Sequence, residues 1–256
     1  MADYRTMNAG AATRTADIDA GLRAHMNKVY GTMSVGLLIT ALAAWALANL
    51  SVSAVPSEFQ IGANEYLTGL GQTLYNTPLK WVLMFAPLAM VFGFGAVINR
   101  LSAAAAQTYF YAYAAVMGLS LSSIFLVFTG MSIAQTFLIT AIAFAGLSLW
   151  GYTTKKDISG WGAFLIMGLI GVIIASIVNI FLGSALMEFV ISVVGVLIFA
   201  GLTAYDTQRI KTDYIAHAHA MDTEWLAKSA IMGALNLYLD FVNLFMFLLQ
   251  FLGNRE

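Results

Sequence analysis

The chain alternates between long apolar stretches and short polar connections. Arg100 and Lys155 are separated by 54 consecutive residues without a formal charge, and 30 more separate Asp157 from Glu188. A bilayer core about 30 Å thick needs roughly 20 apolar residues per helix. Measured against that length, the pattern predicts seven membrane-spanning helices, at residues 29–50, 81–99, 108–128, 132–151, 161–181, 189–210 and 229–252.

Short turn sequences divide these stretches. Residues 129–132 read Thr-Gly-Met-Ser and residues 182–184 read Leu-Gly-Ser, both typical of breaks between helices. No segment alternates with period two, which argues against a β-barrel. We therefore expect an all-α integral membrane protein. A polar N-terminal segment (1–28) without signal-peptide features precedes the seven-helix domain (29–252), a four-residue tail (253–256) follows it, and the loop 51–80 is expected to contain a short amphipathic piece.

Composition narrows the class of protein. Only 10% of the residues are charged, against about 25% in an ordinary soluble domain, and 60% are hydrophobic. The formal net charge of −1 comes without any basic run, so a nucleic-acid partner is not expected. There is no cysteine, which excludes disulfides and cysteine-based metal sites or nucleophiles. The composition thus excludes a soluble globular enzyme, and we expect a membrane protein that is not an enzyme and carries no cofactor.

The lysines and arginines set the expected orientation, because positive residues collect in cytoplasmic loops. With the N-terminus in the cytoplasm, ten of the twelve fall on that side and only Lys80 and Arg255 fall outside. The C-terminus is then outside if the seventh segment crosses fully, and inside if that segment is re-entrant. The ten cytoplasmic positions are Arg5, Arg14, Arg23, Lys28, Arg100, Lys155, Lys156, Arg209, Lys211 and Lys228.

Two aspartates lie where charge is expensive. Asp240 is about eleven residues into the seventh span, roughly 16 Å deep, and a charge there costs about 2.5–3.5 kcal/mol on insertion scales. Asp206 lies near the cytoplasmic end of the sixth span. At 100° per residue, Asp240 shares an arc of about 80° with Ser229, Asn236, Asn243 and Gln250. Asp206 shares a similar face with Glu188, Ser192, Gly195 and Asp213.

The simplest packing turns these two polar stripes toward each other and brings Asp206 and Asp240 together. Two buried carboxyl groups a few ångströms apart resist double ionisation, and one shared proton relieves both desolvation and repulsion. Such a pair responds to protons. When deprotonated it offers up to four oxygens to a cation, and Asn236 and Asn243 could add more. Ca²⁺ prefers 6–8 oxygens, so transport suits the site better than storage. The alternative is that each aspartate only makes structural hydrogen bonds.

Two motifs resemble the signatures of one family. Residues 201–208 read Gly-Leu-Thr-Ala-Tyr-Asp-Thr-Gln and residues 234–245 read Ala-Leu-Asn-Leu-Tyr-Leu-Asp-Phe-Val-Asn-Leu-Phe. They are similar to the sixth-helix and seventh-helix signatures of the Bax inhibitor-1 (TMBIM) family. The resemblance extends over about residues 20–252, toward bacterial YccA- and YetJ-like members. First-span positions that fit are Leu22-Arg23, Val29-Tyr30, Met33, Gly36-Leu37 and Thr40-Ala41.

The resemblance implies a seven-helix bundle with the last helix surrounded by the other six. It also implies a pH-sensitive Ca²⁺ leak in which aspartates matching Asp206 and Asp240 share a proton. An arginine near the cytoplasmic end of the second helix latches to that pair in the closed state. Arg100 is the candidate by position, and a plain topological anchor is its alternative interpretation. The implied location is the bacterial inner membrane, where protons, Ca²⁺ and the bilayer are the partners.

Two other functions are alternatives to the leak. YccA-like relatives bind and restrain a membrane-embedded AAA protease, and the sequence does not choose between leak and restraint. An intramembrane aspartyl protease would share Tyr205-Asp206. Its second motif requires glycines that Tyr238-Leu239-Asp240 lacks, and no proline follows Pro87. The sequence therefore disfavours proteolysis by this chain.

Overall fold

Each long apolar stretch forms one helix in the computed structural model. The structure describes residues 2–57, 59–62, 65–217 and 222–254, with side chains described from residue 18 onward. Within this part of the chain, seven helices are long and apolar enough to cross a membrane, which confirms an all-α membrane protein. They are α1 (Ala2–Ser51), α3 (Leu79–Val97), α4 (Ala103–Leu121), α5 (Gly130–Thr153), α6 (Trp161–Leu182), α7 (Ala185–His217) and α8 (Thr223–Leu252).

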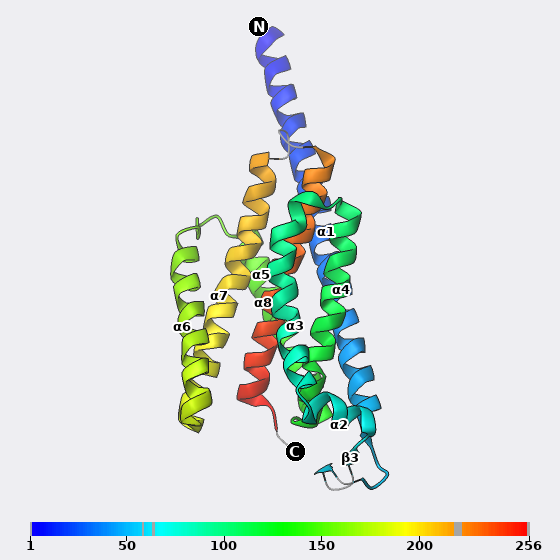
Figure 1. Ribbon diagram of the computed structural model, residues 1–256. Helices are drawn as coiled ribbons and strands as arrows, with labels where there is room; N and C mark the ends of the chain where they lie inside the picture. The colour runs from blue at the N-terminus through cyan, green and yellow to red at the C-terminus, as the bar shows by residue number, and fades with distance from the viewer. Residues whose placement is uncertain (1, 58, 63–64, 218–221, 255–256) are drawn as a thin grey trace.

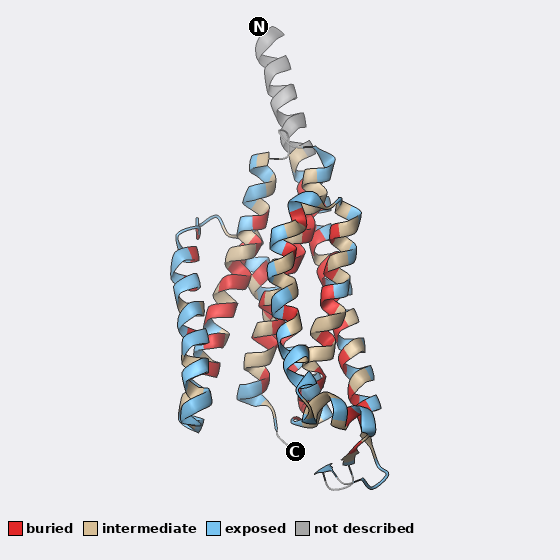
Figure 2. Cartoon of the chain, in the orientation of Figure 1, coloured by how far each residue is buried: buried red, intermediate tan, exposed pale blue. Residues whose placement is uncertain are grey.

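The last helix, α8, is the most buried of the seven spans. It packs against α1, α4, α5 and α7, whereas α3 has its main contacts with α4, and α6 with α7 (Figure 1). Buried residues accordingly concentrate on α8 and on the faces turned toward it, while α6 presents mostly exposed apolar residues (Figure 2). The expectation that six helices surround the seventh is therefore not confirmed: four helices pack against α8, while α3 packs mainly on α4 and α6 mainly on α7.

The first and last helices run the length of the bundle. The two ends of the chain lie at opposite ends of the molecule (Figure 1), and α8 is unbroken over 30 residues. The last segment therefore has the geometry of a full span and not of a re-entrant one. Helix α1 also continues without interruption from the polar residues into the bundle, where Leu22, His25 and Met26 are already buried.

The two predicted breaks are confirmed. Thr129 caps α5, because its hydroxyl accepts a hydrogen bond from the backbone N–H of Ser132. Gly183 ends α6 with φ of 60°, a left-handed conformation that glycine adopts without a Cβ penalty. Two helices end at short 3₁₀ turns: α3 continues into Ile98–Arg100, and α4 into Ser122–Leu126.

The loop between α1 and α3 holds more structure than the sequence pattern indicates. It contains a short helix, α2 (Gly69–Asn76), which Thr68 caps, in the loop where a short amphipathic piece was expected. It also contains an antiparallel sheet in the order β1-β3-β2, with β1 (Val52–Ser53), β2 (Gln60–Gly62) and β3 (Glu65–Leu67). Strands of two or three residues are too short to show an alternating pattern, so periodicity could not predict them.

Candidate functional site

The polar faces of α7 and α8 meet at Ser192 and Gln250 and again at Asp206 and Asp240. Toward the end near the C-terminus, the hydroxyl of Ser192 donates to Oε1 of Gln250 at 3.2 Å. One turn further, Gly195 leaves room for the ring of Phe247, which a Cβ at that position would meet at 2.7 Å. A neighbouring helix approaches closely where it faces small residues. This close packing positions the two aspartates opposite one another.

Asp206 and Asp240 form the centre of the site. Their carboxyl groups lie within hydrogen-bonding range of each other. Asp240 is only 4% exposed, and no N–H or O–H group of the described residues donates to its buried Oδ2 oxygen. Asp206 is half-buried on α7. A buried carboxylate without donors is strongly disfavoured, and a hydrogen bond between the two groups needs one proton. The geometry therefore suits a pair that holds a single proton.

A cavity of about 470 Å³ lies beside the pair, between α6, α7 and α8. Its polar lining consists of the two aspartates, Asn236, Asn243 and Ser176, and apolar side chains make up the remainder. The amide nitrogen of Asn243 donates to the carbonyl of Leu239 at 2.8 Å, which leaves the amide oxygen as its acceptor. The cavity thus gathers oxygen atoms in an otherwise apolar part of the bundle.

Ser176 also lines the cavity, although no motif in the sequence marks it. It lies in α6, and its hydroxyl donates to the carbonyl of Val172 at 2.8 Å. Ser176 and Asn179 are the only two side chains in α6 with a hydroxyl or amide group. Their positions could have indicated which face of α6 turns toward α7 and α8.

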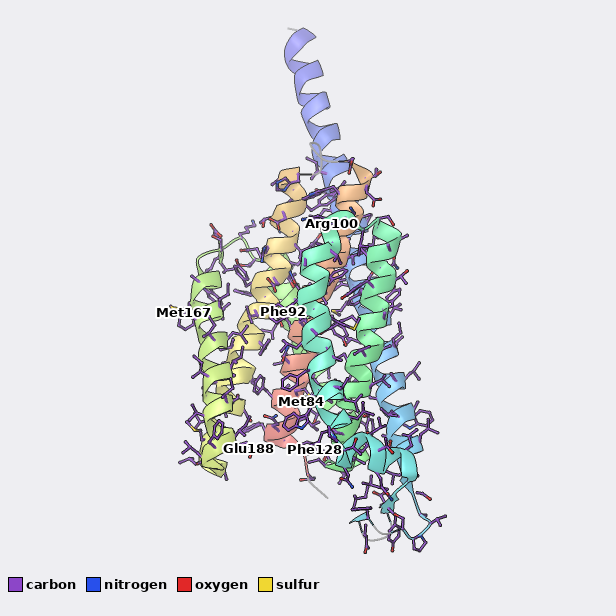
Figure 3. All side chains as sticks on the ribbon, in the orientation of Figure 1. Met84, Phe92, Arg100, Phe128, Met167 and Glu188 are labelled. Carbon is purple, nitrogen blue, oxygen red and sulfur yellow. The ribbon has the colours of Figure 1, made fainter. Side chains whose placement is uncertain are left out.

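Arg100 and Glu188 mark opposite ends of the bundle (Figure 3). Arg100 ends the turn after α3, and its side chain is exposed. Among the described residues, no ion pair joins Arg100 to either aspartate. The positive charge that acts on Asp206 here is that of Arg209, one turn further along α7, which also lies 3.9 Å from Asp213. A latch between Arg100 and the pair is therefore not formed in this conformation.

The residues flanking Asp206 explain why its motif has this composition. A Cβ on Gly151 of α5 would collide with the backbone carbonyl of Ala204, so α5 and α7 touch at their main chains there. On another side, the ring of Tyr205 fills the space that Gly162 of α6 leaves. Asp206 is consequently held on a helix that is packed tightly against two neighbours.

Hydroxyl and amide groups hold α7 in place on its remaining sides. The hydroxyl of Thr207 donates to the carbonyl of Thr203 at 2.7 Å and lies 2.8 Å from the hydroxyl of Ser148 on α5. Gln208 binds the α5–α6 loop, since its amide accepts from the N–H of Ile158 and donates to the carbonyl of Lys156. Apart from Thr203, these partners are 50 or more residues away in sequence, so no local pattern indicates them.

The motif in α8 fixes the other aspartate in a comparable way. The hydroxyl of Tyr238 lies 2.6 Å from that of Thr40 on α1, and Tyr238 is fully buried. Its ring packs edge-on against Phe110 and Tyr113 of α4, with centroids 5.5 and 5.8 Å apart. Asp240, two residues further on, points to the opposite side toward α7. The motif therefore anchors α8 on one face and presents the carboxyl group on the other.

Seven apolar helices, two of which bring a pair of aspartates together, define a multi-pass membrane protein with an intramembrane acidic site. Residues 22–256 match the family model described as "Inhibitor of apoptosis-promoting Bax1". The chain belongs to this Bax inhibitor-1 family, as its two aspartate motifs indicated.

Relatives at high identity cover nearly the whole chain. Inner membrane protein YbhL of Escherichia coli strain K12 is 46% identical over 237 residues, which are 93% of this chain and 94% of YbhL. Protein RP147 of Rickettsia prowazekii is 40% identical over 256 residues, the full length of both chains. Membrane protein SpyM3_0260 of Streptococcus pyogenes is 34% identical over 239 residues, covering 93% of this chain and 96% of the relative.

Proposed function

We propose that the protein is a pH-sensitive Ca²⁺ leak of the bacterial inner membrane, gated by a proton that Asp206 and Asp240 share. The observation that carries the proposal is the placement of these carboxyl groups, facing each other beside a cavity of about 470 Å³ with few other polar groups nearby. An ionisable group inside a membrane span is a functional site by default, because its burial is expensive. The protein acts as a conduit and not as an enzyme.

The shared proton changes the charge that a cation meets. With one proton the pair carries one negative charge, and without it two. A doubly negative pair attracts any cation within reach, including the guanidinium of Arg100, which we propose latches to the pair in the closed state. Protonation weakens that attraction and releases the latch, so the leak opens as the pH falls. Asn236 and Asn243 then add amide oxygens to a transient Ca²⁺ site, short of the 6–8 oxygens that tight binding requires.

The proposed orientation places the N-terminus in the cytoplasm. Ten of the twelve lysines and arginines then lie on the cytoplasmic side, in agreement with the positive-inside rule. The name of YbhL, an inner membrane protein, supports the inner membrane as the location. With α8 as a full span, the C-terminus lies outside.

The direct test is Ca²⁺ entry into proteoliposomes made from the purified protein at a series of pH values. We expect the rate to rise as the pH is lowered, by at most about tenfold per pH unit for a gate that takes up one proton. Protein-free liposomes correct for passive entry. A rate equal to that of the protein-free liposomes at every pH would refute the leak. Co-purification of a membrane AAA protease with a chain that conducts no ions would favour the alternative of protease restraint.

Arg100→Gln tests the latch. Because the neutral side chain cannot pair with ionised aspartates, we expect this variant to leak at neutral pH as fast as the natural chain does at acidic pH. Lys80→Gln is the matched control, since Lys80 is the cation at the other end of the same span, close to Trp81. If Arg100→Gln retains the pH response of the natural chain, Arg100 is only a topological anchor.

A further inference from the structure

A second cavity, of about 500 Å³, lies between α1 and α5, away from the aspartates. Arg23, Asn27 and Tyr30 line it from α1, and Phe144, Ser148 and Tyr152 line it from α5. Its volume falls within the range of about 300–1,000 Å³ typical of small-molecule sites. None of these residues takes part in the proposed leak, so the cavity needs an explanation of its own.

The charged and amide side chains of the cavity are confined to one end along the helix axis, and the only polar group beside Met33 at the other end is the hydroxyl of Ser34. Arg23 and Asn27 lie at the end where the α5–α6 loop emerges, together with Tyr152 near the end of α5. Met33 lines it deeper in the bundle, ten residues or about 15 Å beyond Arg23 along α1, and Phe144 of α5 lines it there as well. This gradient matches a phospholipid that has its headgroup at the membrane surface and an acyl chain running inward.

Hydroxyl groups linked from α1 through α5 to α7 form the inner wall of this α1–α5 groove. The hydroxyls of Tyr30 and Ser148 are 2.7 Å apart, and those of Ser148 and Thr207 are 2.8 Å apart. Thr207 donates its only hydroxyl hydrogen to the carbonyl of Thr203, so Ser148 donates to Thr207 and Tyr30 donates to Ser148. The oxygen of Tyr30 therefore remains an acceptor, suited to a hydroxyl of a lipid headgroup.

The charge at the polar end favours an anion. Arg23 is exposed and has no ion pair among the described residues. The ammonium of Lys211 lies 5.2 Å from the centre of the Tyr152 ring and donates to its carbonyl. On the adjoining loop, Asp157 accepts from the N–H of Ser159, which lowers the pKa of Asp157, so its carboxylate is already engaged by the backbone. Lys155 and Lys156 add two more exposed cations there.

The groove opens on the membrane-facing surface of the bundle. Val35 and Leu38 on α1, and Leu149 on α5, are exposed apolar residues beside it, with Leu38 64% exposed. Basic pockets between membrane helices on the cytoplasmic side recognise anionic lipid headgroups. We propose that the α1–α5 groove binds one anionic phospholipid, with its phosphate at Arg23 and Asn27 and an acyl chain along Met33 and Phe144.

The test is lipid binding by the purified, delipidated full-length protein, measured by native mass spectrometry with phosphatidylglycerol or phosphatidylcholine. One basic side chain near an anionic headgroup contributes about 1 kcal/mol, so we expect about fivefold preference for phosphatidylglycerol. Arg23→Gln is expected to abolish that preference. Lys28→Gln is the matched control, because Lys28 is an exposed cation on the same helix that does not line the groove, and it is expected to retain the preference.

A second variant and a competitor complete the test. Ala145→Phe places a ring in the groove and should weaken binding of both lipids. Inorganic phosphate at millimolar concentration should leave phosphatidylglycerol bound, because it lacks the acyl chains. The proposal is overturned if both lipids bind the natural chain equally, or if phosphate displaces the lipid. It is also overturned if Lys28→Gln and Arg23→Gln reduce the preference for phosphatidylglycerol to the same extent. None of these outcomes depends on the Ca²⁺ leak, since binding alone is measured.

Discussion

Asp206→Asn is expected to fix the leak at its acidic-pH rate at every pH. Asparagine has nearly the shape of aspartic acid but carries no charge, so it imitates a protonated residue permanently. With at most one charge left, the pair can neither share a proton nor hold Arg100 as a doubly negative pair would. We therefore expect Ca²⁺ entry at neutral pH to be about tenfold faster, or more, in this variant than in the natural chain, because the gate responds to one proton. Ca²⁺ entry into proteoliposomes at acidic and alkaline pH measures it.

Asp240→Asn should remove the pH response as well, because the remaining carboxyl group has no partner. Combining both substitutions should add little beyond either one, since residues that act as a unit are not additive. Glu188→Gln is the control, because Glu188 is an acid on α7, the helix of Asp206, and does not line the cavity of the pair. Full pH dependence in either single aspartate variant would show that the pair is not the gate.

Gly151→Ala is expected to destabilise the fold more than a change of one methyl group suggests. The added Cβ would meet the main-chain carbonyl of Ala204, which cannot rotate away, so α5 and α7 must separate. Forcing a group into a packed interior costs about 1–3 kcal/mol. The thermal unfolding midpoint of the purified protein, followed by intrinsic tryptophan fluorescence, should fall by several degrees.

Gly146→Ala provides the comparison on the same helix. A Cβ at Gly146 meets nothing within 4 Å, so this variant should unfold at the temperature of the natural chain or slightly above it. Equal unfolding midpoints for the two variants would mean that the contact between α5 and α7 does not limit stability. A midpoint lowered only for Gly151→Ala would support tight packing behind Asp206.

The pairing of Asp206 with Asp240 could be anticipated because both lie on long helices. A regular helix fixes the direction of every side chain, so one polar stripe on each span is enough to predict which faces meet. The contact between Ser192 and Gln250 arises in the same way. The expected ring of six helices around α8 came from family resemblance instead, and α3 and α6 lie outside that ring.

Contacts between distant segments could not be predicted in this way. The hydroxyls of Tyr30 and Ser148 are separated by 118 residues, and a tyrosine or a serine on an apolar helix does not indicate its partner. The carboxylate of Glu224, at the start of α8, accepts from the backbone N–H of Ala103, the first residue of α4. The sequence shows only that Glu224 is acidic. Such contacts depend on how the helices are arranged in three dimensions.

The central claim is that Asp206 and Asp240 hold one proton between them. Infrared difference spectroscopy of the purified protein measures it directly, because a protonated carboxyl group absorbs separately from a carboxylate. We predict that the natural chain has a protonated carboxyl band that weakens as the pH rises. Both Asp206→Asn and Asp240→Asn should lack a band at that frequency. A band that neither substitution alters, or its absence from the natural chain at every pH, would contradict the account.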